Sequence, residues 1–345
     1  MLKTLQNAFK VKDVRHRIFY VLMMLVVIRI GSQLPVPGVD GSYFKTWFES
    51  QTGDAFNFLD AFTGGSFSQM SIFALSITPY ITSSIIIQLL TIAIPKLEEM
   101  QRDGEDGRKK LGAITRYVTI GLSLFESIAM AIGFGNKGLI PDNSFVKMVV
   151  VVVALTAGSA FLMWVGEQIN EKGVGNGISI VLLINIVSRI PSDMTKLYES
   201  FMKGKIIAKA LLSGVIIAAI IVGVVILVII LNGAERRIPV QYSKKMQGRK
   251  MMGGQSSHIP LKVNTAGVIP VIFASSIMSF PSVIASFLGK TGGTGIGGKI
   301  LAGMNSNNWF DLEHPWYSIG LVAYIVMVIF FAYFYTSITF NPLEV

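Results

Sequence analysis

The chain has 345 residues, of which 52% are hydrophobic and only 14% are charged, whereas charged residues make up roughly a quarter of a typical soluble chain. Its mean hydropathy of +0.59 implies more apolar surface than one folded chain can bury, so a lipid bilayer must cover the remainder. The absence of cysteine excludes disulfides and thiol chemistry. A net charge of +10 favours acidic partners, either anionic lipid or nucleic acid.

Apolar runs long enough to cross a bilayer recur along the chain. A spanning helix needs about 20 apolar residues, and runs bounded by charge, proline or glycine predict eight spans. They lie at residues 18–34, 72–94, 114–134, 145–166, 177–190, 206–231, 265–288 and 317–338. The fifth is short and interrupted by Asn185 and Ser188, which favours a position facing a polar interior. The sequence therefore predicts an all-α, polytopic membrane protein.

The basic residues are divided unequally between the loops. Counted alternately from the N-terminus, the loops on one side contain 19 Lys and Arg residues and those on the other side contain 10. By the positive-inside rule the N-terminus is expected to be cytoplasmic. Of the two long cytoplasmic loops, residues 96–116 mix both charges and indicate a solvated connector. Residues 233–262 have seven basic residues against one acidic, which fits either a positive-inside anchor or, as the loop's length favours, a docking surface.

No catalytic, metal-binding or cofactor-binding pattern is found in the sequence. The three histidines, His16, His258 and His314, are far apart, and no serine lies in a G-x-S-x-G elbow. Residues 292–300 approach the phosphate-binding loop pattern, but Ile300 stands where that loop requires a magnesium-binding serine or threonine. We therefore expect no enzyme activity and no cofactor.

Two ionisable residues lie within the predicted spans. Arg29 is close enough to the outer interface to extend its charge toward water, so an anchoring role and a functional role are both open. Glu126 lies in the middle of its span, where it could cap a neighbouring helix or line a cavity.

A short apolar stretch at residues 55–62 cannot cross the bilayer, and Gly64 and Gly65 follow it, which indicates a re-entrant segment with a hinge. Pro79 and Pro270 interrupt the second and seventh spans and are each followed by a pair of serines. This pattern indicates either an internal repeat with the working site between its halves or a coincidence of common membrane residues. A secondary transporter with a small-molecule site between inverted repeats is the alternative, although it would need charged groups beside the broken helices.

Ordered motifs from one end of the chain to the other resemble the SecY family, the central subunit of the bacterial Sec protein-translocation channel. They are RIGS (29–32), PVPG (35–38), FALSITPYITSSIIIQL (73–89), WVGEQI (164–169), GNGIS (175–179), ERRIPV (235–240), and NTAGVIP (264–270) through Phe280 and Pro281. The resemblance implies eight transmembrane helices of a ten-helix inverted-repeat fold, with the family's last two spans absent. It divides the chain into an N-terminal half at 1–190, with a plug at about 55–68, and a partial C-terminal half at 191–345.

The resemblance also assigns candidate site residues. The pore ring would comprise Ile81, Ile85, Leu182 and Ile272. The plug would include Phe56, Phe58, Leu59, Phe62, Gly64, Gly65 and Ser66. The lateral gate would comprise Pro79, Ser83, Ser84, Ile86, Gln88, Ser275, Ser276 and Phe280. Cytoplasmic docking would involve Arg236, Arg237, Lys244, Lys245, Arg249 and Lys250.

The function implied by the resemblance is that of a protein-conducting channel in the bacterial inner membrane. It would translocate unfolded secretory polypeptides and release hydrophobic segments laterally into lipid. The implied partners are the SecE and SecG subunits, the SecA motor ATPase, the ribosome, unfolded preproteins with their signal peptides, and membrane lipid. A channel formed by this chain alone would be open on one side.

Overall fold

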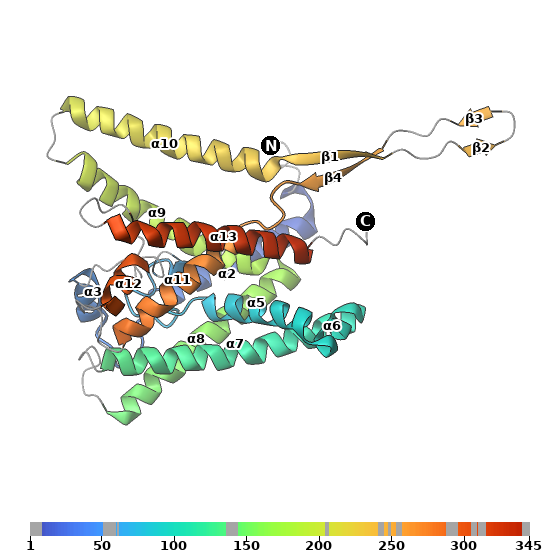
Figure 1. The fold of residues 1–345 in the computed structure, drawn as a ribbon. Coiled ribbons are helices and arrows are strands. Elements are labelled where there is room, and N and C mark those ends of the chain that lie inside the picture. Colours follow the sequence, from blue (N-terminus) through green and yellow to red (C-terminus); the bar gives the residue numbers. More distant parts are fainter. Residues whose placement is uncertain are drawn as a thin grey trace. The chain divides into compact units, whose positions relative to one another are not determined.

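The computed structural model describes residues 9–50, 60, 62–135, 144–203, 207–240, 245–247, 250–252, 257–287, 296–304, 309 and 315–339. The chain divides into two compact units, residues 1–192 with 281–308 and residues 193–280 with 309–345. The helices along the chain, drawn in Figure 1, are α2 (Lys12–Gly31), α3 (Gly41–Ser50), α5 (Thr78–Ala93), α6 (Pro95–Arg102), α7 (Gly104–Gly135), α8 (Phe145–Lys172), α9 (Gly177–Phe201), α10 (Ile207–Gly233), α11 (Ile269–Phe287), α12 (Ile296–Met304) and α13 (Ser318–Thr339), with a short 3-10 helix η2 (Pro315–Tyr317) before α13.

The helical, polytopic architecture predicted from the sequence is confirmed. Within the described residues, five helices are long and apolar enough to cross a membrane, and α5 with α6 form a sixth candidate that bends by 104°. The first and seventh predicted spans lie in α2 and α11, which are also helical. In α2, charged residues fill the first turns, from Lys12 to Arg17, and shorten its apolar part.

The two prolines expected to interrupt spans instead begin helices. Pro79 is the second residue of α5 and Pro270 the second of α11. A proline is favoured in the first turn because its missing N–H would have no partner there and its fixed φ suits a helix. The second predicted span is therefore a series of turns over residues 72–77 followed by a helix.

Two connections are more regular than expected. The solvated connector predicted at 96–116 is α6 and the beginning of α7, joined at Gly104, whose φ of +72° is accessible to glycine. The fifth span continues through Pro191 to Phe201 instead of ending at residue 190. At its start, Asn176 Oδ1 accepts the backbone N–H of Ile178 at 3.1 Å and so caps the helix.

The first unit has two hydrophobic clusters. In one, the rings of Phe44, Phe67 and Phe134 meet edge to face, with centroids 4.9 Å apart for Phe44 and Phe134. They join α3, the turns before α5, and the end of α7. The second cluster joins α2, α8 and α9, and its members are Met24, Ile28, Phe73, Ile77, Leu162, Val165, Ile169 and Val181.

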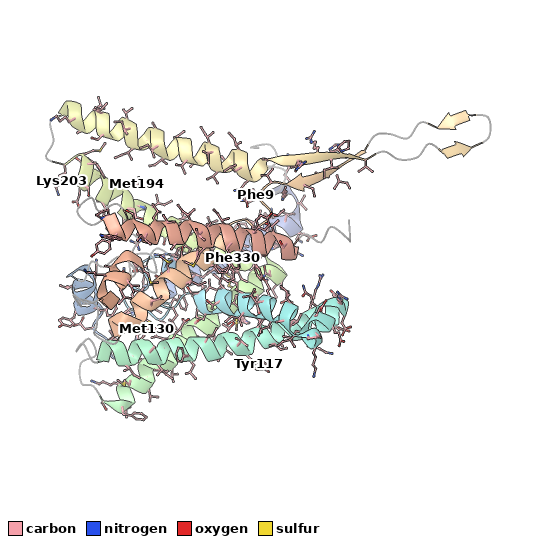
Figure 2. The ribbon with its side chains drawn as sticks, in the orientation of Figure 1. Phe9, Tyr117, Met130, Met194, Lys203 and Phe330 are labelled. Carbon is pink, nitrogen blue, oxygen red and sulfur yellow. The ribbon has the colours of Figure 1, made fainter. Side chains whose placement is uncertain are left out.

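The face of α7 turned away from these clusters is apolar and exposed. Tyr117 on this helix is 76% exposed, whereas Met130, further along the same helix, is 4% exposed; both are labelled in Figure 2. Arg116 is linked to Glu167 on α8 at 2.6 Å. An exposed apolar face on a helix of this length suits contact with lipid.

In the second unit, α10 leads into a β ribbon (Figure 1). Strand β1 (Glu235–Val240) pairs antiparallel with β4 (Ser257–Lys262), and β2 (Lys245–Gln247) pairs with β3 (Lys250–Met252). The basic connection at 233–262 therefore contains paired strands, which were not predicted. Pro239 and Pro260 lie within them, and a two-stranded ribbon consists only of edges, where a proline is tolerated.

Candidate pore and plug site

Two of the four predicted pore-ring residues approach one hydrophobic cluster. Ile81 on α5 and Leu182 on α9 are half-buried, and both pack against the cluster that contains Ile28 and Ile77. Ile85, one turn beyond Ile81, is 8% exposed. The fourth residue, Ile272, is half-buried in α11, in the second unit. Its convergence with the other three stays a prediction.

The serines predicted to hold the lateral gate donate within their own helices. The Ser83 hydroxyl donates to the Pro79 carbonyl at 2.7 Å, and the Ser275 hydroxyl donates to the Val271 carbonyl at 2.7 Å. Such bonds to the preceding turn commit the hydroxyl hydrogen to the helix itself. Ser275 also lies 3.3 Å from the Tyr324 hydroxyl of α13. The hydroxyl hydrogens of Ser83 and Ser275 therefore need not bond to a neighbouring gate helix.

The other gate candidates are distributed over α5 and α11. Ser84 and Ile86 are half-buried and Gln88 is exposed. Ser276 and Phe280 lie on α11, but their side chains are outside the described residues.

Of the predicted plug, only the second part is described. Phe56, Phe58 and Leu59 lie outside the described residues, whereas Phe62, Gly64, Gly65 and Ser66 lie at the beginning of the turns that lead to α5.

Gly64 lies close against α9. Its φ is +69° and that of Gly65 is +84°, so both glycines adopt the left-handed conformation that other residues disfavour. A Cβ added at Gly64 would lie 2.8 Å from the carbonyl oxygen of Asn185 and 3.0 Å from Ser188 Oγ. The turn requires glycine at residue 64 for both its conformation and its contact.

Two arginines that contact the plug were not among its predicted residues. Arg189 Nη1 donates to Asp60 Oδ2 at 2.6 Å, and Arg29 Nη1 donates to Ser188 Oγ at 3.0 Å and to the Gly64 carbonyl at 3.4 Å. Arg29, whose role was open, thus joins α2 to α9 and to the plug. No sequence pattern connects residues so far apart, although a charge within a span was a signal for Arg29.

Glu126, the other charge predicted within a span, lies half-buried on α7. It forms no hydrogen bond or ion pair with another residue of the described part of the chain. Nearby on the same helix, Ser127 Oγ accepts a hydrogen bond from Thr156 Oγ1 of α8 at 3.1 Å. Beside Glu126, the polar contact between α7 and α8 is therefore made by hydroxyl groups, and nearer the start of α7 it is the ion pair of Arg116 with Glu167.

The docking candidates lie on the β ribbon. Arg236 and Arg237 are exposed neighbours in β1, so their side chains point to opposite faces of the ribbon. Lys245 begins β2 and Lys250 begins β3. Lys244 and Arg249 lie outside the described residues.

Three features of the structure define a multi-pass membrane protein of the channel class. They are the spanning helices, the apolar cluster against which α5 and α9 pack, and the non-spanning segment that contacts α9. A sequence profile of the SecY family matches residues 71–345. The protein translocase subunit SecY of Halalkalibacterium halodurans is 43% identical over 99% of this chain and 77% of that protein.

Solved structures of channels share the fold. "The structure of a protein conducting channel" matches with a TM-score of 0.63 over 95% of this chain and 73% of the other, at 18% identity. "Sec61 in the Canine ribosome-channel complex from the endoplasmic reticulum" matches with a TM-score of 0.61 over 95% and 74%, at 19% identity. The chain therefore belongs to the SecY family, and it is a protein-conducting channel subunit of the Sec translocon, not an enzyme.

Proposed function

We propose that Ile81, Ile85, Leu182 and Ile272 form an apolar collar through which unfolded secretory polypeptides pass. The observation that supports it is that Ile81 and Leu182, from helices about a hundred residues apart in the sequence, pack against one cluster. Branched aliphatic side chains at a constriction exclude water and so resist ions. They also offer no fixed hydrogen bonds that would retain a passing chain.

The plug, residues 55–68, would close the outer funnel of the resting channel, and α5 and α11 would form the lateral gate. The first turns of both helices contain a proline, so each helix begins at a defined point. A hydrophobic signal segment would leave the collar between them and enter lipid, where its apolar surface is more stable than in the aqueous pore.

The exposed arginines of β1 support a cytoplasmic docking surface. Arg236 and Arg237, with Lys244, Lys245, Arg249 and Lys250, would bind the SecA motor ATPase or ribosomal RNA, because a basic surface favours negatively charged partners. SecE and SecG would be the partner subunits. The N-terminus would then be cytoplasmic and the chain would lie in a bacterial inner membrane.

The function is tested with proteoliposomes that contain the assembled channel. When SecA and ATP are added outside, an unfolded secretory protein is expected to become protected from external protease. The double variant R236Q/R237Q should reduce the protected fraction severalfold, and more strongly at low salt, because added salt screens the contribution of these two charges in the parent channel as well.

Lys209→Gln is the matched control, because it removes a positive charge at the opposite end of α10, about 36 Å from Gly233 at 1.5 Å per residue. It should leave the protected fraction unchanged. Lack of protection with the parent channel would contradict the conduit function. Full protection in R236Q/R237Q at every salt concentration would contradict the docking surface alone.

A further inference from the structure

Charged side chains converge on the plug root, which we define as Asp60 and residues 62–68. Asp60 lies 2.6 Å from Arg189, and the two side chains are only 5% and 14% exposed. A buried ion pair is weakly screened by salt, and removing one partner leaves the other charge unpaired in a poorly hydrated place. The pair is therefore a specific contact and not a solvated surface pair.

Asp60 also organises the plug root internally. Its Oδ1 accepts the backbone N–H of Ser68 at 2.8 Å, and its carbonyl accepts the backbone N–H of Gly65 at 3.1 Å. Thr63 Oγ1 accepts the backbone N–H of Phe67 at 3.2 Å. These bonds use one carboxylate oxygen of Asp60 and leave the other, Oδ2, for Arg189 on α9. One oxygen of the Asp60 carboxylate therefore stabilises the conformation of the root, and the other binds the root to α9.

A single turn of α9 receives the plug root. The carbonyl oxygen of Asn185 accepts the Ser188 hydroxyl at 2.7 Å, and Ser188 accepts Arg29 from α2 at 3.0 Å. Gly64 packs against the same turn, and its carbonyl is the second acceptor of Arg29. Near the C-terminal end of the root, Phe67 packs in the aromatic cluster of the first unit. The residues before Phe67 can therefore leave α9 while Phe67 stays in place.

We propose that Asp60, Arg29 and Arg189 act as positioning residues, a clasp that holds the plug root on α9 and α2 in the resting channel. Breaking the Asp60–Arg189 ion pair is the step that frees the plug. The inference rests on the proposed role of residues 55–68 as the plug, and it specifies which bonds keep that plug seated.

Two buried serines allow the clasp to be tested. The chain has no cysteine, so a single introduced thiol is the only one in this chain that can be labelled. Ser66 in the root and Ser159 on α8 are each 1% exposed, and neither hydroxyl has a hydrogen-bond partner within the described part of the chain. Replacing either with cysteine therefore removes no such bond. In the reconstituted, assembled channel, the labelling rate of S66C measures how exposed the root becomes. The labelling rate of S159C measures how exposed the packed helices of the unit become.

The measurement is the rate of labelling by N-ethylmaleimide. D60N and R189Q are each expected to raise the rate at S66C severalfold and to leave the rate at S159C unchanged. R189K keeps the charge and should retain more protection than R189Q. The control R116Q breaks another ion pair between elements of the unit, Arg116 to Glu167, and should leave S66C as slow as in the parent.

An unchanged S66C rate in D60N and R189Q would overturn the clasp. So would an equal rise at S66C and S159C, which would mean that the whole unit had loosened, or an effect of R116Q as large as that of D60N. Failure of the clasp is distinct from failure of the proposed function, because protease protection of a translocated substrate by the parent channel does not depend on either variant.

Discussion

Replacing Ile81, Ile85 and Ile272 together with glycine is expected to raise the resting ion conductance of the assembled channel severalfold. Each substitution removes a branched apolar side chain, so the constriction becomes wider and exposes more backbone. A hydrophobic constriction excludes ions because water leaves it, and a wider, more polar one fills with water. The measurement is the single-channel current in planar bilayers with no translocating substrate.

The control replaces Ile92, Ile128 and Ile277, which are 55%, 41% and 45% exposed, with glycine. It introduces the same loss of helix stability that glycine causes, about 1 kcal/mol per residue, at positions outside the collar. Resting currents that stay at the parent level in the collar variant would contradict the seal. Equal increases in the two triple variants would show that helix weakening, and not the collar, determines the leak.

Phe134→Ala is expected to lower the free energy of unfolding of the first unit by about 3–5 kcal/mol, the cost of truncating a fully buried phenylalanine. The ring is 2% exposed and meets Phe44 edge to face with the centroids 4.9 Å apart. Alanine would leave a cavity where α3, α7 and the turn at Phe67 join. Thermal unfolding in detergent should show a lower Tm.

Phe125→Ala on the same helix is the comparison, because Phe125 is 65% exposed and its loss leaves no cavity. Its Tm should stay close to that of the parent. A Phe134 variant that unfolds at the same temperature as the Phe125 variant would contradict the role of the aromatic cluster as the anchor behind the plug.

The spanning helices could be predicted because their length follows from the thickness of the bilayer. Runs such as residues 145–166 and 206–231 are apolar over the length that a membrane requires, and both became helices, α8 and α10. The residues at which helices begin were harder to predict. Pro79 indicated a break inside a span, whereas the structure begins α5 at Thr78, because a proline favours a first turn as much as it disfavours an interior one.

Contacts between distant residues could not be predicted from local patterns. Arg189 counted only as a basic residue in an outer loop, yet it lies on a helix and pairs with Asp60, 129 positions earlier. The strands β1 and β4 were missed for a related reason. Arg237 faces Pro260 across the ribbon, and pairing between segments about twenty residues apart overrides the low strand preference of each proline.

The collar is tested most directly by crosslinking from inside it. A photo-reactive residue is placed at Ile81 or at Leu182, and a secretory polypeptide is stalled during translocation through the assembled channel. The collar predicts crosslinks to the stalled polypeptide from both positions and none from Ile128 on α7, which is exposed outside the apolar clusters. Crosslinks from residues 81 and 182 to lipid, with none to the polypeptide, would contradict a conduit lined by these side chains.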